Sequence, residues 1–217
     1  HPELIIDEPT LRVVYTPSRY FASEPKADVS VVLRNPKAMN SAKNQVMFAL
    51  NDYLAGIALD QLSNQAAVGG ISFSTNANNG LMLNANGYTQ RLPQLFQALL
   101  EGYFSYTPTE EQLEQAKSWY AQMMDSAEKG KAYDLALMPA QMLSQVPYFQ
   151  REDRRALLPS ISLKDVLAYR DALKTNTRPE FLIVGNMSED QAKTLAENVR
   201  TQLGSKGDEW CRNQDVL

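Results

Sequence analysis

The chain has 217 residues, of which 44% are hydrophobic and 21% charged, and its formal net charge is −4. This length and composition are typical of one globular domain with a sizeable core. Nucleic-acid binding is not expected, because the basic residues form no concentrated block. A membrane span is not expected either, because no apolar run approaches the roughly 20 residues that a spanning helix needs.

Histidine and cysteine are almost absent from the chain. His1 and Cys211 are the single residues of their kinds, and they lie at opposite ends. Catalytic zinc is held by imidazole, thiolate or converging carboxylate groups, and serine and cysteine hydrolases usually need a histidine base beside the nucleophile. We therefore expect no catalytic residue, no metal ligand and no bound cofactor in this segment. One cysteine also excludes an internal disulfide.

The first third of the chain predicts two strands and a long helix. Residues 11–16 and 28–34 are rich in β-branched side chains, and a proline follows each run closely, which predicts two strands. Apolar residues then recur at helical spacing as far as Val68. This period predicts one long helix with Asn40 or Ser41 as its N-cap.

A β-hairpin is predicted after this helix. Residues 71–75 and 81–85 alternate apolar and polar side chains, which is typical of strands with one buried face. Residues 76–80 between them read Asn-Ala-Asn-Asn-Gly. Asn and Gly tolerate positive φ, so this segment favours a turn that joins two antiparallel strands.

The middle of the chain is predicted to be mostly helical. Residues 92–106 carry a broad apolar stripe. A capping-box pattern at residues 109–112 predicts a second helix that runs to about Glu128. Residues 131–145 are predicted as a third helix, which Pro139 should bend or break.

The last part of the chain predicts a helix, a strand and a final helix. Residues 151–155 are interpreted as a charged, solvated turn. Capping patterns predict helices over residues 162–174 and 188–204. Residues 181–185 are apolar at nearly every position, which predicts a central strand with both faces buried.

The order of these elements indicates an α+β fold, with one mostly antiparallel sheet and helices packed mainly on one of its faces. We expect a single domain over residues 11–204, a linker at residues 1–10 and a linker tail at residues 205–217. The chain begins without an initiator methionine and shows no signal-peptide pattern, so we interpret it as a piece of a longer polypeptide.

Three groups of side chains could be functional, and each has a simpler interpretation. Glu110, Glu111 and Glu114 could act as acid and base, but the dipole of a helix N-terminus stabilises acidic groups there, and we favour that explanation. The second group is aromatic and could bind peptides: Tyr88, Tyr103, Phe104, Tyr106, Trp119 and Tyr120. The third group could form an interface between domains: Met123, Met124, Met138 and Met142. Aromatic and methionine side chains at helical spacing are more often core residues.

Seven short segments carry a family resemblance: Tyr20–Ala27, Leu50–Ala55, Gly69–Phe73, Gly87–Arg91, Glu101–Phe104, Met138–Ala140 and Phe181–Met187. In this order, and across nearly the whole chain, they resemble the pitrilysin and insulin-degrading-enzyme family. Its members are large zinc metalloendopeptidases. The resemblance implies four similar α+β domains that form two bowl-shaped halves around a closed chamber.

The resemblance also implies where the zinc is held. The first domain of the family carries the inverted motif His-x-x-Glu-His on its first long helix. This chain resembles the third domain, and its corresponding helix contains Leu50-Asn-Asp-Tyr-Leu-Ala55. Neither Asn51 nor Tyr53 replaces an imidazole on zinc, and Asp52 alone supplies one ligand. No catalytic or metal-binding residue of the family therefore carries over.

Two functional hypotheses follow. In the first, the chain is a non-catalytic domain that forms part of the chamber wall and size-selects peptide substrates, while another domain of the same polypeptide holds zinc. In the second, it is a peptide-binding or self-associating module without enzymatic activity, because an exposed sheet edge can accept an extended peptide. The resemblance implies a bacterial periplasmic location. An independent hydrolase is disfavoured, because the required groups are missing.

Overall fold

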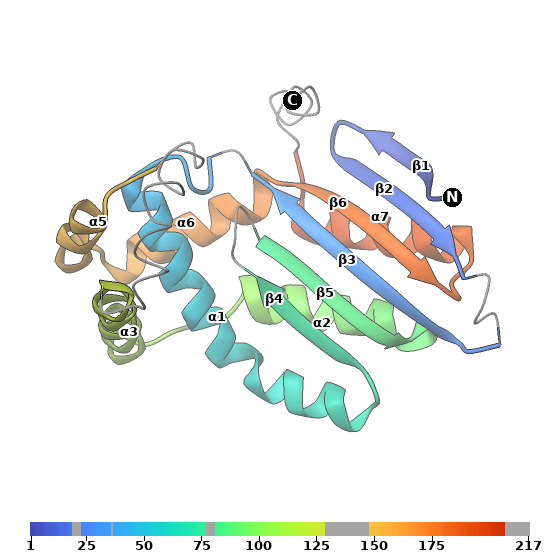
Figure 1. The fold of residues 1–217 in the computed structure, drawn as a ribbon, viewed down its shortest axis with the longest axis horizontal. Helices are drawn as coiled ribbons and strands as arrows, with labels where there is room; N and C mark the ends of the chain where they lie inside the picture. The colour runs from blue at the N-terminus through green and yellow to red at the C-terminus, as the bar shows by residue number, and fades with distance from the viewer. Residues whose placement is uncertain (19–22, 36, 77–80, 129–147, 207–217) are drawn as a thin grey trace.

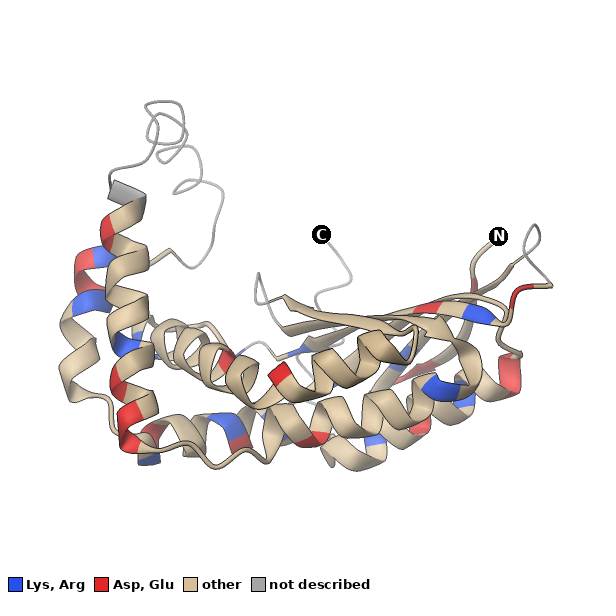
Figure 2. Ribbon diagram, turned by 90° about the horizontal axis from the view of Figure 1, so that it is seen from below, with Lys and Arg blue, Asp and Glu red and all other residues tan. Residues whose placement is uncertain are grey.

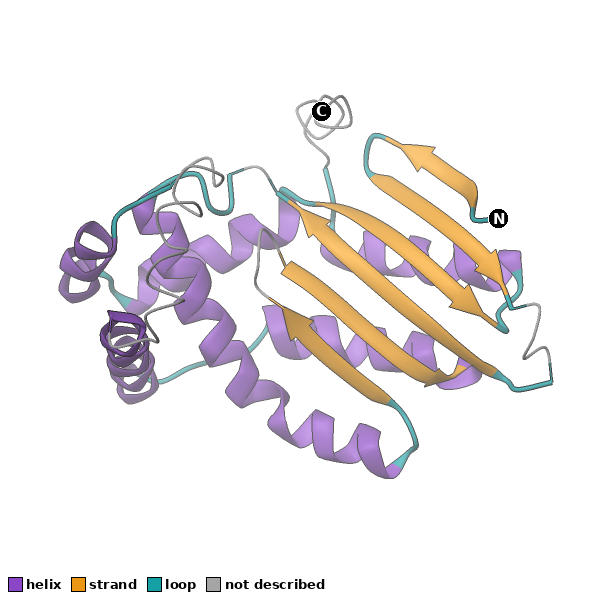
Figure 3. Ribbon diagram, in the orientation of Figure 1, coloured by secondary structure: helices purple, strands orange, loops and turns teal. Residues whose placement is uncertain are grey.

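The computed structural model describes residues 1–18, 23–35, 37–76, 81–128 and 148–206 (Figure 1). These residues form two layers, a six-stranded sheet and a set of helices that covers one of its faces (Figure 2 and Figure 3). The predicted α+β class, with helices mainly on one face, is confirmed. None of the described helices is both long and apolar enough to cross a membrane.

The elements occur in nearly the order predicted. The strands are β1 (Glu3–Glu8), β2 (Leu11–Pro17), β3 (Lys26–Arg34), β4 (Ser72–Asn76), β5 (Leu81–Tyr88) and β6 (Arg178–Gly185). The α-helices are α1 (Ala42–Val68), α2 (Leu92–Phe104), α3 (Glu110–Glu128), α5 (Arg151–Leu157), α6 (Leu163–Thr175) and α7 (Glu189–Leu203). Two short 3-10 helices are η1 (Thr89–Arg91) and η2 (Leu158–Ser160).

The sheet is mixed rather than purely antiparallel. Its strand order is β1-β2-β6-β3-β5-β4. Among the described strands, β2 and β6 run parallel, and every other neighbouring pair is antiparallel, including the predicted β4–β5 hairpin. The parallel pair arises because β6 follows the helical part of the chain and enters between β2 and β3. A strand that returns through a long connection can run parallel to its neighbour, whereas hairpins impose the antiparallel direction.

The predicted linker at residues 1–10 is wrong, because strand β1 lies there and pairs with β2. The Arg178 guanidinium on β6, which is only 3% exposed, donates hydrogen bonds to the Asp7 carboxylate at 2.9 Å and to the Glu8 carbonyl at 3.2 Å. The Arg200 guanidinium on α7 (Glu189–Leu203) also bonds to the Glu8 carboxylate at 2.5 Å. The contacts that stabilise this segment therefore come from distant parts of the chain, which its own sequence does not reveal.

Strand β6 is central, as predicted, but only one of its faces is buried. Phe181 and Ile183 point into the core, whereas Leu182 and Val184 are 45% and 37% exposed. The expectation of two buried faces was wrong because the helices cover one side of the sheet (Figure 2).

The core lies between the sheet and the helices. Alternate residues of β2, β3, β5 and β6 face the helices, which is the period expected of a sheet covered on one side. The largest fully buried side chains include Phe48 and Leu50 of α1 and Phe96, Leu99 and Tyr103 of α2. These two helices therefore contribute much of the apolar surface that the sheet buries.

The predicted helix caps are confirmed. Ser162 and Ser188 form capping boxes with the residues three positions later, at the starts of α6 and α7. The backbone and side chain of Thr109 make the same reciprocal bonds with Gln112 before α3. The Ser41 hydroxyl accepts a bond from a backbone N–H in the first turn of α1. Each cap satisfies amide groups that would otherwise lack a partner.

The charged stretch at residues 151–155 is helical, so its interpretation as a turn was wrong. It forms most of α5, none of whose residues is buried. Acidic residues occupy its first turn and basic residues its last turn. Both placements are favourable with the helix dipole, which explains how so polar a segment can be helical.

Some predictions fall on residues outside the described part of the chain. They are most of the turn at 76–80, the helix at 131–145 with Met138 and Met142, and most of the tail at 205–217 with Cys211.

Gly185, at the end of β6, permits a very close approach between β6 and β3. It lies opposite Ala27 and has φ of +135°. A Cβ at this position would lie 2.6 Å from the Ala27 Cα and 2.7 Å from the Lys26 carbonyl oxygen. Because both neighbours are backbone atoms, no rotamer change can relieve the clash, and only glycine fits.

We expect Gly185→Ala to lower the free energy of unfolding by about 3 kcal/mol, the scale of backbone strain combined with a steric clash. Urea unfolding followed by circular dichroism measures the change. Gly56→Ala in α1 is the matched control, because a Cβ there meets nothing within 4 Å. It should stabilise the chain by up to about 1 kcal/mol. Equal effects of the two variants would contradict the close approach at Gly185.

Candidate functional site on the uncovered sheet face

The segment Leu50–Ala55 of α1 occupies the position at which the resemblance would place a zinc motif. Asn51 is fully buried, and its Oδ1 accepts a hydrogen bond of 2.7 Å from the Tyr106 hydroxyl. The Asp52 carboxylate accepts a bond of 3.0 Å from the Tyr103 hydroxyl. Tyr103 lies in α2 and Tyr106 follows that helix, so these bonds join α1 to α2 inside the protein.

Burial governs the electrostatics of this cluster. It raises the pKa of the Asp52 carboxyl, and the hydrogen bond from Tyr103 opposes that shift. Burial also raises the pKa values of Tyr103 and Tyr106, and the Asp52 charge adds to both shifts. The Arg170 guanidinium lies 5.2 Å from the centre of the Tyr106 ring and lowers the pKa of that hydroxyl in opposition. Both tyrosines therefore stay protonated and act as donors.

The segment does not fit a zinc ion. Asn51 is a neutral acceptor that Tyr106 already engages, and Asp52 is bonded to Tyr103. The Tyr53 ring stacks on Trp119 of α3, with the ring centres 4.9 Å apart. Across the described ranges of the chain, no group of three His, Cys, Asp or Glu side chains could hold a metal ion.

The other side chains singled out in the sequence divide between core and surface. Glu110 and Glu111 lie exposed in the first turn of α3, where the helix-dipole interpretation places them, and Glu114 pairs with Lys117 at 2.8 Å. Four of the six aromatics are buried: Tyr103, Phe104, Tyr106 and Tyr120. Tyr88, Trp119 and Met123 are exposed, whereas Met124 is buried.

On the face of the sheet that the helices leave uncovered, side chains from distant segments of the chain meet. One row crosses all six strands, with each residue opposite the next: Leu4, Val14, Leu182, Ser30, Asn84 and Ser74. A second row lies beside it: Thr16, Val184, Asp28, Asn86 and Ser72. Within these two rows, the residues of β1, β2 and β6 are apolar except Thr16, and those of β3, β5 and β4 are polar. The next row on this face mixes charged, polar and apolar side chains: Arg12, Glu180, Val32, Met82 and Asn76.

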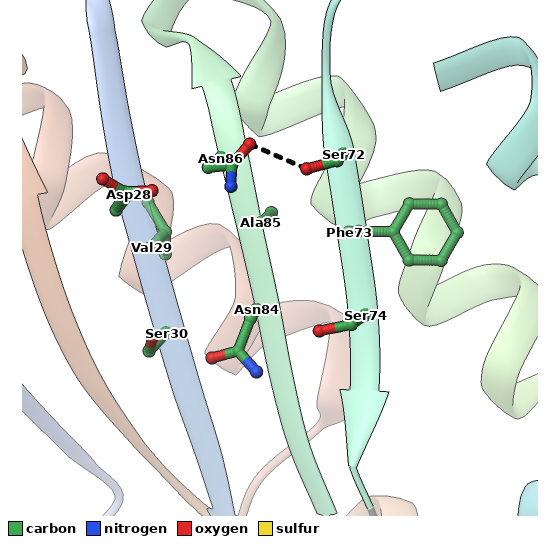
Figure 4. A pocket seen from close by; sticks show the side chains of 9 residues that line it. All are labelled: Asp28, Val29, Ser30, Ser72, Phe73, Ser74, Asn84, Ala85 and Asn86. Carbon is green, nitrogen blue, oxygen red and sulfur yellow. Dashed lines mark hydrogen bonds between the residues drawn. The ribbon is translucent and has the colours of Figure 1, made fainter. Parts of the chain in front are cut away.

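The polar part of the first two rows contains a shallow pocket of about 130 Å³. Six polar side chains from three strands line it: Asp28, Ser30, Ser72, Ser74, Asn84 and Asn86 (Figure 4). The Ser72 hydroxyl and the Asn86 side-chain oxygen are joined by a hydrogen bond of 2.7 Å, with Ser72 as donor. Phe73 points away from these side chains in Figure 4. We define these six residues as the Ser/Asn pocket.

Sequence reasoning did not find this pocket. The alternation of serine and asparagine with apolar residues in the hairpin is visible in the sequence, and it predicts one polar face. Strand β3 contributes Asp28 and Ser30 only because it pairs with β5, more than fifty positions away in the chain. No local pattern predicts that pairing.

We expect Asp52→Asn to change how stability depends on pH, because it keeps the acceptor for Tyr103 but removes the buried charge. A carboxyl whose folded-state pKa is raised binds its proton more tightly in the folded state. It therefore lowers stability as the pH rises above its unfolded pKa of about 4. The free energy of unfolding of Asp52→Asn, relative to the parent, should rise between about pH 4 and 7.

Urea titrations at several pH values test this expectation. Asp60→Asn, which changes an exposed carboxylate on the same helix, is the matched control and should show no such rise. Stability curves for Asp52→Asn and the parent that stay parallel across this range would contradict the desolvation of Asp52.

The known proteins that this chain resembles are longer polypeptides, of which it matches one part. Residues 1–156 match the family described as the middle or third domain of peptidase M16. The chain is 81% identical to Protease 3 of Shigella flexneri over all 217 residues, which are 23% of that protein. The chain thus spans about a quarter of the length of the curated relatives that it matches first.

Solved structures agree with this assignment. A crystal structure of pitrilysin superposes with a TM-score of 0.93 at 81% identity, over 98% of this chain and 23% of that one. A peptidase M16 inactive domain from Pseudomonas fluorescens, at 12% identity, shares the fold with a TM-score of 0.69, over 95% of this chain and 52% of that one. The chain belongs to the peptidase M16 family and corresponds to its middle or third domain.

Proposed function

We propose that this chain is a non-catalytic domain of a zinc metalloendopeptidase and forms part of the wall of a chamber that encloses peptide substrates. The observation that carries the proposal is the match to the middle or third domain of peptidase M16, with 81% identity to Protease 3 along the whole chain. The single histidine, at position 1, supports a role without histidine-dependent chemistry.

Zinc and the reacting groups belong, in this proposal, to another domain of the same polypeptide. The Asn51 and Asp52 side chains support this division, because hydrogen bonds to tyrosines stabilise them inside the helical layer. The parent protein would act on peptides small enough to enter the chamber. We place it in the bacterial periplasm, on the family resemblance alone.

The uncovered sheet face is the surface that we assign to the chamber side. Its strands present polar and apolar side chains to the outside, whereas the opposite face is covered by helices. Helix α3 rises past the plane of the sheet on the uncovered side (Figure 2). A face that carries both kinds of side chain and a shallow pocket suits contact with peptides of varied sequence.

Self-association is the alternative, and exposed apolar residues support it. Leu4 of β1 and Leu182 and Val184 of β6 are exposed on the uncovered face, with Val14 of β2 between the two strands. Contiguous apolar surface of this kind promotes association when nothing covers it. Sedimentation velocity at several concentrations distinguishes the alternatives, because a concentration-independent monomer would remove self-association.

We expect the purified 217-residue chain to hold no stoichiometric zinc and to cleave no peptide, with or without added zinc. Metal analysis and a fluorogenic peptide assay on the same sample test this. The full-length protein that contains the chain serves as the positive control. Zinc-dependent cleavage by the chain alone would contradict the proposal.

We expect Ser30→Tyr, made in the full-length protein, to raise the KM for peptides by up to about tenfold, which corresponds to ~1.4 kcal/mol of lost binding. Tyrosine is a good strand former, so the sheet should tolerate it while the centre of the uncovered face is filled. Asn198→Tyr, at an exposed position of α7, is the control and should leave KM unchanged. Equal KM values for Ser30→Tyr and the parent would contradict a chamber-side role for this face.

A further inference from the structure

The composition of the Ser/Asn pocket is not explained by folding. Asp28 lies opposite Asn86, and Ser30 lies opposite Asn84, on the neighbouring strands β3 and β5. Aspartate and asparagine are among the poorest strand formers, whereas threonine or another β-branched residue would suit an exposed strand position better. Three such residues, Asp28, Asn84 and Asn86, gather on one patch of one face. A binding role would account for this local cost.

The pocket also has unused hydrogen-bonding capacity. Within the described part of the chain, the side chains of Asp28, Ser30, Ser74 and Asn84 make no hydrogen bond to another protein group. Asn86 accepts from Ser72 through its oxygen, which leaves its amide N–H groups available. An asparagine amide offers both donors and acceptors, as does the main chain of a peptide. The pocket can therefore bind amide groups whatever the sequence that carries them.

Charge indicates which side chain such a peptide would present. Asp28 is the single charged residue among those that line the pocket. The nearby Lys26 ammonium is engaged elsewhere, 3.9 Å from the Glu24 carboxylate and 5.7 Å from the centre of the Tyr88 ring. The Asp28 carboxylate is thus an exposed anion with no cation paired to it in the described residues.

The surface next to Asp28 is apolar. Val184 lies opposite Asp28 on β6, and Leu182 lies two residues before it on the same face. Lysine and arginine side chains bury their aliphatic stems on apolar surface while their charged ends remain solvated. A stem across these two residues would bring its cationic end to Asp28.

We propose that Asp28 binds a lysine or arginine side chain of an extended peptide that lies on the uncovered sheet face. Val184 and Leu182 contact the aliphatic stem, and Asn84 and Asn86 bind neighbouring main-chain groups of the peptide. This inference rests on the proposed function, because it names a specificity-determining residue for peptides held in the chamber.

The test uses the full-length protein and a set of peptides in which lysine replaces norleucine at each position in turn. Norleucine keeps the aliphatic stem and removes the charge. At one position or more, the parent should have a lower KM for the lysine peptide than for the norleucine peptide. We expect Asp28→Asn to reduce this ratio of the two KM values by about threefold, the scale of a solvent-exposed ion pair. The preference should weaken as salt is added.

Two variants make the test specific. Asp60→Asn removes an exposed carboxylate from α1 and should leave the KM ratio as it is in the parent. Asp28→Glu keeps the charge and should restore most of the preference for lysine, which a loss of folding would not allow. The turnover number kcat should stay the same in Asp28→Asn and the parent, because Asp28 acts on the binding of the peptide.

The outcomes separate this inference from the proposed function. If Ser30→Tyr raises KM but Asp28→Asn never changes the ratio, the face lines the chamber and the Asp28 subsite is overturned. If neither variant changes KM, the chamber-side role of the face is overturned as well. If Asp28→Asn and Asp60→Asn change the ratio equally, the effect is one of net charge, and the subsite is again overturned.

Discussion

The insertion of β6 between β2 and β3 is the constraint on which the rest of this structure depends. It joins β1 and β2 to the strands β3, β5 and β4. One continuous sheet is thereby built from two distant parts of the sequence. Gly185 permits the backbone contact with β3 at one end of the strand. At the other end, the buried guanidinium of Arg178 bonds to β1 and to Glu180, so its desolvation is offset by ionic partners from two strands.

Because helices cover only one face of this sheet, the fold separates its structural and its interacting surfaces. The covered face is continuously apolar, and the helices α1 and α2 add a buried polar cluster to it. In that cluster, Asn51 and Asp52 accept bonds from Tyr106 and Tyr103. These two bonds specify how α1 lies against α2, and the buried side-chain nitrogen of Asn51 has no hydrogen-bond partner among the described residues. The same positions are thereby unsuited to a metal ion.

The uncovered face has a different physical character, because its side chains meet water or a partner rather than a core. Over β1, β2 and β6 it carries exposed apolar side chains, including Leu182 and Val184 of β6. Over β3, β5 and β4 it concentrates asparagine and serine where strand propensity disfavours them. In a chain that corresponds to one domain of an M16 peptidase, such a face suits weak contacts with many peptides, since amide-binding groups and short apolar surfaces are tolerant of sequence.

The sequence by itself determined most of the local elements. Helical period and capping residues such as Ser162 and Ser188 predicted every described α-helix except α5, because those signals act within a few residues of the chain. The single histidine and the composition of Leu50–Ala55 led to the prediction that no zinc site lies in this segment, and that prediction awaits metal analysis. Only the tertiary structure decided that residues 3–8 form a strand, that β6 has one exposed face and that Asp28 meets Asn86. Strand pairing and the covering of a face join residues far apart in the chain, and the free energy of such contacts has no counterpart in local sequence.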